Sequence, residues 1–168
     1  MIAPIIEIEN NILESLKKLF EGETFDTEKL GKKELKFYKG FLPYVEYKER
    51  LKNNDKDGNE TKDIPFILLK YRGDIQTLRE GVYDGTATFE MIIGTYNKSN
   101  SGYHTNMYIA DKIKKKFMEY SNVPEEYAIC QNYIKTELLD DVCSNYYWFS
   151  RLEFKAYIPC YTSEIKIY

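Results

Sequence analysis

The sequence predicts a single α+β domain, in which an antiparallel or mixed sheet of about four strands carries helices on one face. Apolar residues recur at helical spacing over residues 5–20 and 104–120. Short apolar runs or alternating patterns, typical of strands, occur at residues 65–71, 85–96, 127–138 and 146–158. The order of helix, two strands, helix and two strands favours an antiparallel sheet with helices on one side. The length of 168 residues fits one domain that spans the whole chain.

The two helices are predicted from the spacing of their apolar residues. In the first, these residues are Ile5, Ile8, Ile12 and Leu16. In the second, they include Met107, Ala110, Ile113 and Phe117. Gly22 ends the first helix, and Pro124 follows the second, where the residue before a proline resists helical backbone. We also expect residues 28–38 to add a short helical turn before Gly40.

The last strand has the clearest alternation of the four. One face carries the apolar residues Trp148, Leu152, Phe154, Ala156 and Ile158. The other carries the charged residues Arg151, Glu153 and Lys155. We expect only the apolar face to be buried in a monomer. Residues 72–84, in contrast, are polar, and their secondary structure is ambiguous from the sequence.

Residues 52–63 contain no apolar side chain and predict a mobile, solvated loop. Within it, residues 55–59 (DKDGN) match the opening of a calcium-binding EF-hand loop. The match fails further along, because Glu60 stands where the loop needs glycine and Phe66 where it needs a bidentate glutamate. We therefore predict no metal site in this loop.

Composition limits the partners and the compartment. The net charge of −3 argues against specific nucleic-acid binding through a broad basic field. The three consecutive residues Lys114 to Lys116 would point in different directions around a helix, so they predict a solvated helix surface. The first residues lack the features of a secretory signal, and no apolar run is long enough to span a membrane. Three cysteines without a CxxC pair fit a reducing, cytosolic compartment.

Motifs for catalysis are absent from the sequence. It contains no phosphate-binding, dinucleotide-binding, esterase or metalloprotease motif. His104 is the single histidine and the one candidate general base, and its place at a helix start predicts a solvent-facing residue. The acidic pairs at residues 125–126 and 140–141 fall in predicted turns. We predict a protein that is not an enzyme, with no catalytic, cofactor-binding or metal-binding residue. A hydrolase would require His104 beside a cysteine or carboxylate in a deep pocket.

Aromatic residues are unusually frequent, with 16 Tyr and 9 Phe. Tyrosine suits surfaces that are exposed in a monomer and covered in an assembly, because its large apolar ring ends in a polar hydroxyl. An AT-rich source genome explains the same composition, since Lys, Asn and Ile are also common. Both explanations stay open at this point.

Four stretches together resemble the tail-terminator, or tail-completion, family of tailed phages. They are a strand opening at residues 65–68 (PFIL), a strand ending at residues 93–97 (IGTYN), a Gly-Tyr pair at residues 102–103 before a helix, and an aromatic strand from residue 146 to Pro159. The order and spacing of these parts carry the resemblance, which covers residues 65–159. Asn97 departs from the pattern, because an acidic residue is common there. The segment of residues 46–63 is also longer and more polar than in the family.

The resemblance implies a structural virion protein that caps the phage tail tube as a ring and provides the surface for head attachment. It also implies three partners: copies of itself in a homo-oligomer, with a hexamer as one candidate, the tail tube protein and the head-tail connector. The protein would then occur in the bacterial cytoplasm during assembly and in the virion tail. Arg151, Glu153, Lys155 and the polar loop are the candidate contact residues. Alternatives are a head-tail connector, another minor tail protein, or a non-enzymatic host binding or regulatory module.

Overall fold

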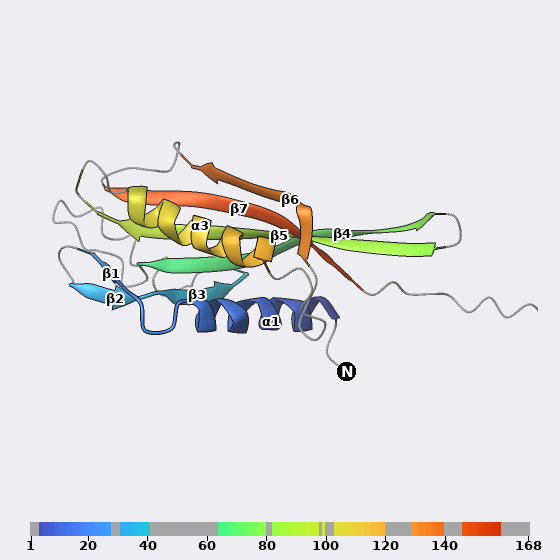
Figure 1. Ribbon diagram of the computed structural model, residues 1–168, viewed down its shortest axis with the longest axis horizontal. Helices are drawn as coiled ribbons and strands as arrows, with labels where there is room; N and C mark the ends of the chain where they lie inside the picture. Colours follow the sequence, from blue (N-terminus) through green and yellow to red (C-terminus); the bar gives the residue numbers. More distant parts are fainter. Residues whose placement is uncertain are drawn as a thin grey trace, which may run out of the picture.

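The computed structural model describes residues 4–27, 31–40, 64–79, 82–97, 99, 103–119, 129–139 and 146–158 (Figure 1). The helices are α1 (Pro4–Leu19) and α3 (Tyr103–Glu119). The strands are β1 (Thr24–Asp26), β2 (Lys32–Glu34), β3 (Lys36–Lys39), β4 (Phe66–Arg79), β5 (Val82–Tyr96), β6 (Ile129–Leu138) and β7 (Tyr147–Tyr157). The predicted α+β class is confirmed.

The main sheet has five strands in the order β3-β4-β5-β7-β6. The neighbouring strands run antiparallel except β3, which pairs in parallel with β4 and makes the sheet mixed. Strands β1 and β2 form a separate antiparallel pair. The four strands predicted from the sequence correspond to β4, β5, β6 and β7.

The predicted helical turn at residues 28–38 is wrong in its described part, because β2 occupies residues 32–34 and β3 occupies residues 36–39. Strand β3 is stabilised by its pairing with β4: the amide of Lys36 donates to the carbonyl of Pro65, and the amide of Gly40 donates to that of Leu69. Phe37 packs against the main core and Tyr38 against a second cluster. Four residues are too few for this alternation to stand out in the sequence.

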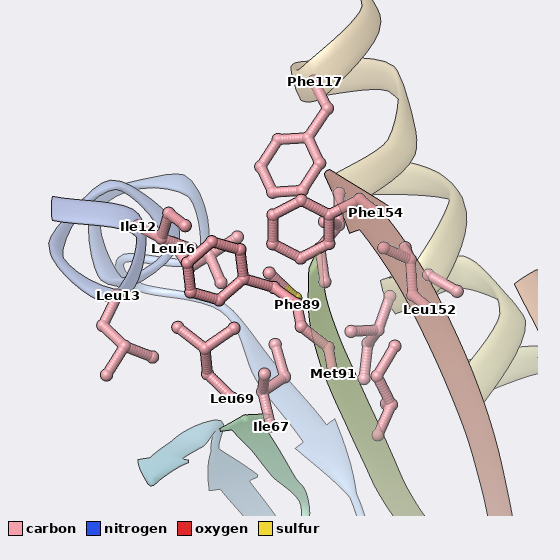
Figure 2. Packing of buried hydrophobic residues seen from close by; sticks show 14 of the residues in the cluster. Ile12, Leu13, Leu16, Ile67, Leu69, Phe89, Met91, Phe117, Leu152 and Phe154 are labelled. Carbon is pink, nitrogen blue, oxygen red and sulfur yellow. The ribbon is translucent and has the colours of Figure 1, made fainter. Parts of the chain in front are cut away.

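Both helices cover the same face of the sheet, where the main core lies. The sheet contributes alternate residues of three strands, among them Ile67, Leu69, Phe89, Met91, Leu152 and Phe154, all fully or almost fully buried. Figure 2 shows Ile12 and Leu16 of α1 and Phe117 of α3 directed at these residues. The ring of Phe154 stacks on that of Phe89, with 5.6 Å between centroids. The main core therefore lies between the two helices and one face of the sheet.

A second cluster lies on the opposite face, which we call the outer face. Its buried residues are Ile64, Phe66, Leu68 and Tyr96, and Tyr38, Ile92, Tyr147 and Phe149 pack against them. The expectation that β7 buries only one face is therefore wrong at its start, since Tyr147 and Phe149 face outward from the main core. From Arg151 onward the outer face of β7 is charged, as predicted.

Strand pairing also extends through residues 72–79 and 82–84, which were ambiguous in the sequence. Strand β4 continues to Arg79 and β5 begins at Val82, so the two form one long hairpin. The register shifts between Tyr71 and Gly73, where Arg72 is the extra residue of a β-bulge. Gly73 has a φ of 142°, a backbone conformation that favours glycine. The bulge interrupts the alternation of side chains and so conceals the strand in the sequence.

Gly94 pairs with Phe66 across the hairpin, and the phenylalanine ring occupies the space above the glycine. A β-carbon added at Gly94 would lie 2.3 Å from the nearest ring atom. The ring cannot move away easily, because it packs against the rings of Tyr38 and Phe149, each with 6.4 Å between centroids. Glycine is therefore required at this position by close packing.

We predict that Gly94→Ala lowers the free energy of unfolding by about 1–3 kcal/mol, the usual cost of overpacking a core. Urea denaturation measures this change. In a Phe66→Leu background, the same substitution should cost clearly less than in the wild-type protein, because the obstructing ring is gone. A cost below about 0.5 kcal/mol in the wild-type background would contradict the packing described here.

Candidate assembly surfaces

The β4–β5 hairpin extends beyond the rest of the sheet. The pairing of β5 with β7 ends at Thr86 and Tyr157, but its pairing with β4 continues to Val82 and Arg79. At about 3.4 Å per residue, the hairpin continues roughly 14 Å past the last β7 pair. Figure 1 shows this green hairpin projecting from one end of the molecule. We call residues 75–79 and 82–86 the arm.

The arm exposes two large apolar side chains, Ile75 at 63% and Leu78 at 59% of their full surface. Ile75 pairs with Thr86, and Leu78 pairs with Tyr83. Successive strand residues point to opposite faces, so two residues that lie three positions apart point in opposite directions. A flat partner surface can cover only one of these two side chains. The arm therefore suits a partner that encloses it from both faces.

The predicted contact residues of β7 lie together on the outer face. The Arg151 guanidinium is bonded to the Glu137 carboxylate of β6, and its Nη1 lies 3.8 Å from Oε2 of Glu90 on β5. The same Glu90 atom lies 3.9 Å from Nε of Arg72 on β4. Alternating charges thus cross four strands of the sheet.

The other two predicted contact residues flank Tyr133 of β6. Its hydroxyl donates a hydrogen bond to the Glu153 carboxylate, and the Nζ of Lys155 lies 4.4 Å from the centre of its ring. All three predicted residues are half-buried and have partners within the chain. Their contact with a neighbouring subunit stays a prediction.

The charged residues of the outer face influence one another's protonation. The pKa of Glu137 is lowered by the hydrogen bond from Lys135, and next by that from Arg151. The pKa of Tyr133 is raised, mainly by its hydrogen bond to Glu153. Both pKa shifts follow from pairing between side chains of the same chain.

We predict that NMR titration will place the pKa of the Glu137 carboxyl below that of an ordinary glutamate. Lys135→Met and Arg151→Met should each raise it, with the larger rise for Lys135→Met, because each substitution removes a donor that favours the charged carboxylate. Lys115→Met, on α3, is the matched control and should leave it unchanged. If neither β6 nor β7 substitution moves the Glu137 titration, the described pairing is incorrect.

Aromatic residues gather at the end of the sheet opposite the arm. The Tyr103 ring, at the start of α3, lies 5.8 Å from that of Trp148 and 4.5 Å from that of His104. The indole of Trp148 donates a hydrogen bond to the carbonyl of Asn97 over 3.3 Å. Tyr146, which precedes β7, is half-exposed and has a φ of 72°, in the left-handed region that few non-glycine residues adopt.

His104 is exposed, as predicted, and lines a groove of about 470 Å³ at this end. The other lining residues are Glu23, Thr24, Phe25, Thr105 and Tyr108. The groove includes one carboxylate, but Glu23 is bonded to Lys112 and lies 3.3 Å from the Tyr108 hydroxyl. We call this depression the α3 groove.

The lysines of α3 lie beside acidic residues. The Nζ of Lys114 is 3.7 Å from an Asp111 oxygen, and that of Lys115 is 3.7 Å from a Glu119 oxygen. Ion pairs between residues three or four positions apart are typical of a solvent-exposed helix surface. A second depression, of about 540 Å³, runs along the same helix and is lined by Leu19, Tyr108, Asp111, Lys112, Lys115, Lys116 and Glu119.

Several features singled out in the sequence lie outside the described residues. These are the polar loop of residues 52–63 with its calcium-like stretch, the acidic pairs at residues 125–126 and 140–141, and two cysteines, Cys143 and Cys160. Cys130, at the start of β6, is buried. In the part of the chain that the structure describes, no group of three His, Cys, Asp or Glu is placed to hold a metal ion. Neither α1 nor α3 is long and apolar enough to cross a membrane.

Asn106 is a structural residue that the sequence reasoning missed. It is fully buried in the first turns of α3, and its Nδ2 lies 3.0 Å from the Ile93 carbonyl, 2.9 Å from the Trp148 carbonyl and 3.3 Å from the Thr95 hydroxyl. These contacts attach the start of the helix to both β5 and β7. The sequence did contain a signal for this burial, because Asn106 lies on the same apolar helix face as Ile109 and Ile113.

We predict that Asn106→Ala lowers the free energy of unfolding by about 1–3 kcal/mol, because it leaves buried carbonyls without their donor. Urea denaturation measures the loss. The matched control is Asn132→Ala at an exposed position of β6, which should change stability by less than about 0.5 kcal/mol. Equal effects of the two substitutions would show that the Asn106 amide does not connect the helix to the sheet.

Comparison of the chain with models of known protein families gave no match, and comparison with curated proteins gave none either. The similarity to tail terminators therefore rests on the order and spacing of the sequence motifs.

Proposed function

We propose that the protein is a structural assembly protein that caps a phage tail tube as a ring of identical subunits and provides the surface for head attachment. The observation that carries this proposal is the arm. It exposes Ile75 and Leu78 on opposite faces; Leu78 lies past the last pair between β5 and β7, and Ile75 lies level with that pair. In this proposal, these two side chains, one on each face of the arm, are covered by a partner protein in the assembly.

The positions of the motif residues support the resemblance to tail terminators. Tyr96 pairs with Tyr147 at the shared end of β5 and β7, and their rings lie 4.8 Å apart. Tyr103, from a third motif segment, also contacts Trp148 of the last one. Motifs separated by about fifty residues thus meet at one end of the molecule, opposite the arm. Different surfaces at the two ends are what a subunit needs for heterologous contacts around a ring.

The charged outer face provides a further surface for the tube or the connector. Arg151, Glu153 and Lys155 are the proposed contact residues there, and each keeps part of its side chain accessible. Charged residues at the rim of an interface mainly determine orientation and association rate. In this proposal, the arm provides most of the affinity for the partner, and the charged face determines how the partner is oriented. The protein would then act in the host cytoplasm during assembly and stay in the virion tail.

We predict that the protein, mixed with tail tube subunits, gives tubes of limited length with ring-shaped caps in electron micrographs. Ile75→Lys with Leu78→Lys should abolish the caps and leave tube lengths uncontrolled, because two charged side chains cannot be enclosed in an apolar contact. Met118→Lys is the matched control, since Met118 is similarly exposed but lies at the end of α3.

Uncontrolled tube lengths with the wild-type protein would contradict the proposal. A head-tail connector or another minor tail component would then be the better explanation, and binding of the protein to purified connector would separate these two possibilities. Retention of caps by the arm variant would contradict only the role of the arm.

A further inference from the structure

The arm has an open backbone edge along β4. Strand β3, which pairs with β4 on the side away from β5, ends at Lys39 opposite Leu69. The Glu9 carboxylate of α1 then accepts a hydrogen bond from the backbone amide of Tyr71. Beyond that point, no strand in the described part of the chain pairs with this side of β4. We call this side of residues 72–79 the open edge.

The backbone groups of alternate residues point out of the open edge. Gln76 pairs with Gly85, whose carbonyl accepts a hydrogen bond from the amide of Ile158, just after β7. In an antiparallel pair, opposite residues either bond to each other or both face away, so the backbone N–H and C=O of Gln76 point away from β5. Asp74 and Leu78, two positions to either side, point the same way. The open edge thus presents the amides and carbonyls of three residues to a further strand.

A strand added at the open edge meets both faces of the arm at once. Its side chains alternate between the two faces, so they lie beside Ile75 on one face and beside Leu78 on the other. Proteins commonly block an open edge with charged residues or proline. The stretch from Ile75 to Leu78 (IQTL) contains neither. The open edge therefore permits the addition of a strand, and an added strand covers both exposed apolar side chains.

We propose that the arm binds an extended segment of a different protein as an added β-strand along the open edge. The segment carries apolar residues on both of its faces, one beside Ile75 and one beside Leu78. Backbone hydrogen bonds to Asp74, Gln76 and Leu78 provide affinity, as they do wherever a peptide adds a strand to a sheet. This inference rests on the proposed function only for the source of the segment, which in that assembly is the tail tube protein.

A second arm fits the open edge less well than a segment of a different protein does. In one continuous sheet, residues opposite each other lie on the same face, so Ile75 of one arm cannot lie opposite Leu78 of another. Two antiparallel arms can place Ile75 opposite Ile75 or Leu78 opposite Leu78, but these two pairings need different registers. One apolar side chain of each arm then lacks an apolar neighbour. A different sequence can match both positions in a single register.

Backbone hydrogen exchange in the presence of a model strand tests the contact in the full chain. The probe is a synthetic peptide of sequence KTVTTVTK, whose two valines point to opposite faces of a strand. With excess peptide, we expect the amides of Asp74, Gln76 and Leu78 to exchange about tenfold more slowly or less, because they then donate to the peptide. The amides of Ile75 and Thr77 face β5 and should change little.

The alternating pattern distinguishes strand addition from other contacts. Protection that is absent, or equal at all five amides, would contradict the proposal, as would protection confined to the edge of β6. Alternating protection in the protein without peptide would also overturn it. If that protection increases with protein concentration, a second copy occupies the open edge, and if it does not, another part of the same chain does.

Two substitutions at position 76 separate the backbone from the side chain. Gln76→Ala keeps the outward amide and should bind the peptide as the wild-type protein does. Gln76→Pro removes that amide without removing a hydrogen bond within the hairpin, so it should weaken peptide binding by about tenfold or more. Slow exchange at Ile75 and Thr77 confirms that the arm of each variant stays paired. Equal affinities of the two variants would show that the edge amide is not used.

Substitutions on each face test whether the partner contacts both. Ile75→Thr and Leu78→Thr keep a residue typical of strands, and each should weaken peptide binding by about two- to fivefold. Met118→Thr, at an exposed position of α3, is the matched control and should leave the affinity unchanged. A loss with only one of the two arm substitutions would show a partner that lies against one face, and would overturn the proposal.

The two proposals fail in different ways. If the peptide gives alternating protection but tubes are not capped, strand addition at the arm is correct and the tail-capping function is wrong. If tubes are capped but neither the peptide nor tube subunits give alternating protection, the capping function is correct and strand addition is wrong.

Discussion

Strand β5 forms hydrogen bonds with β4 on one side and with β7 on the other, and the different lengths of these two pairings determine the shape of the molecule. Where both pairings exist, from Thr86 to Gly94, the sheet has helices on one face and a large, continuous core. Where β7 has ended, only the hairpin continues, and neither helix has a packed sheet to cover. The arm is thus a direct consequence of unequal strand length. The exposure of Leu78, which lies past the last β7 pair, follows from the same geometry, whereas Ile75 lies level with that pair.

The opposite end of β5 is held in place by two close contacts. The Phe66 ring lies over Gly94, and the Asn106 amide donates to carbonyls of β5 and β7. The first contact requires a residue without a side chain at position 94, and the second requires a buried hydrogen-bond donor at position 106. They position the start of α3, and with it the groove that His104 and Tyr108 line. The start of α3 and the arm are thus held at opposite ends of the same long strand, β5.

The sequence was sufficient to predict α1, α3 and β7, because the apolar residues of each recur regularly along its length and pack against the core. It was insufficient for β3, which is four residues long and stabilised by backbone pairing with distant β4. The sequence reasoning also missed the arm. The extra residue Arg72 shifts the alternation of side chains along β4, and a hairpin exposed to solvent on both faces shows no alternation of buried and exposed positions. The α3 groove was not predictable, since Phe25 and Tyr108 come from distant segments. The class and the main helices were therefore accessible from local periodicity, whereas the candidate surfaces depend on long-range pairing.

Two unlike surfaces on one chain do not by themselves determine the form of the assembly. Head-to-tail contacts close into a ring when the rotation between neighbours divides a full turn, and otherwise continue as an open filament. A rigid β-hairpin fixes this rotation more strictly than a flexible loop, because its direction is set by its continuity with β4 and β5. In the proposed capping assembly, the symmetric end of a tube would select the closed arrangement over the open filament.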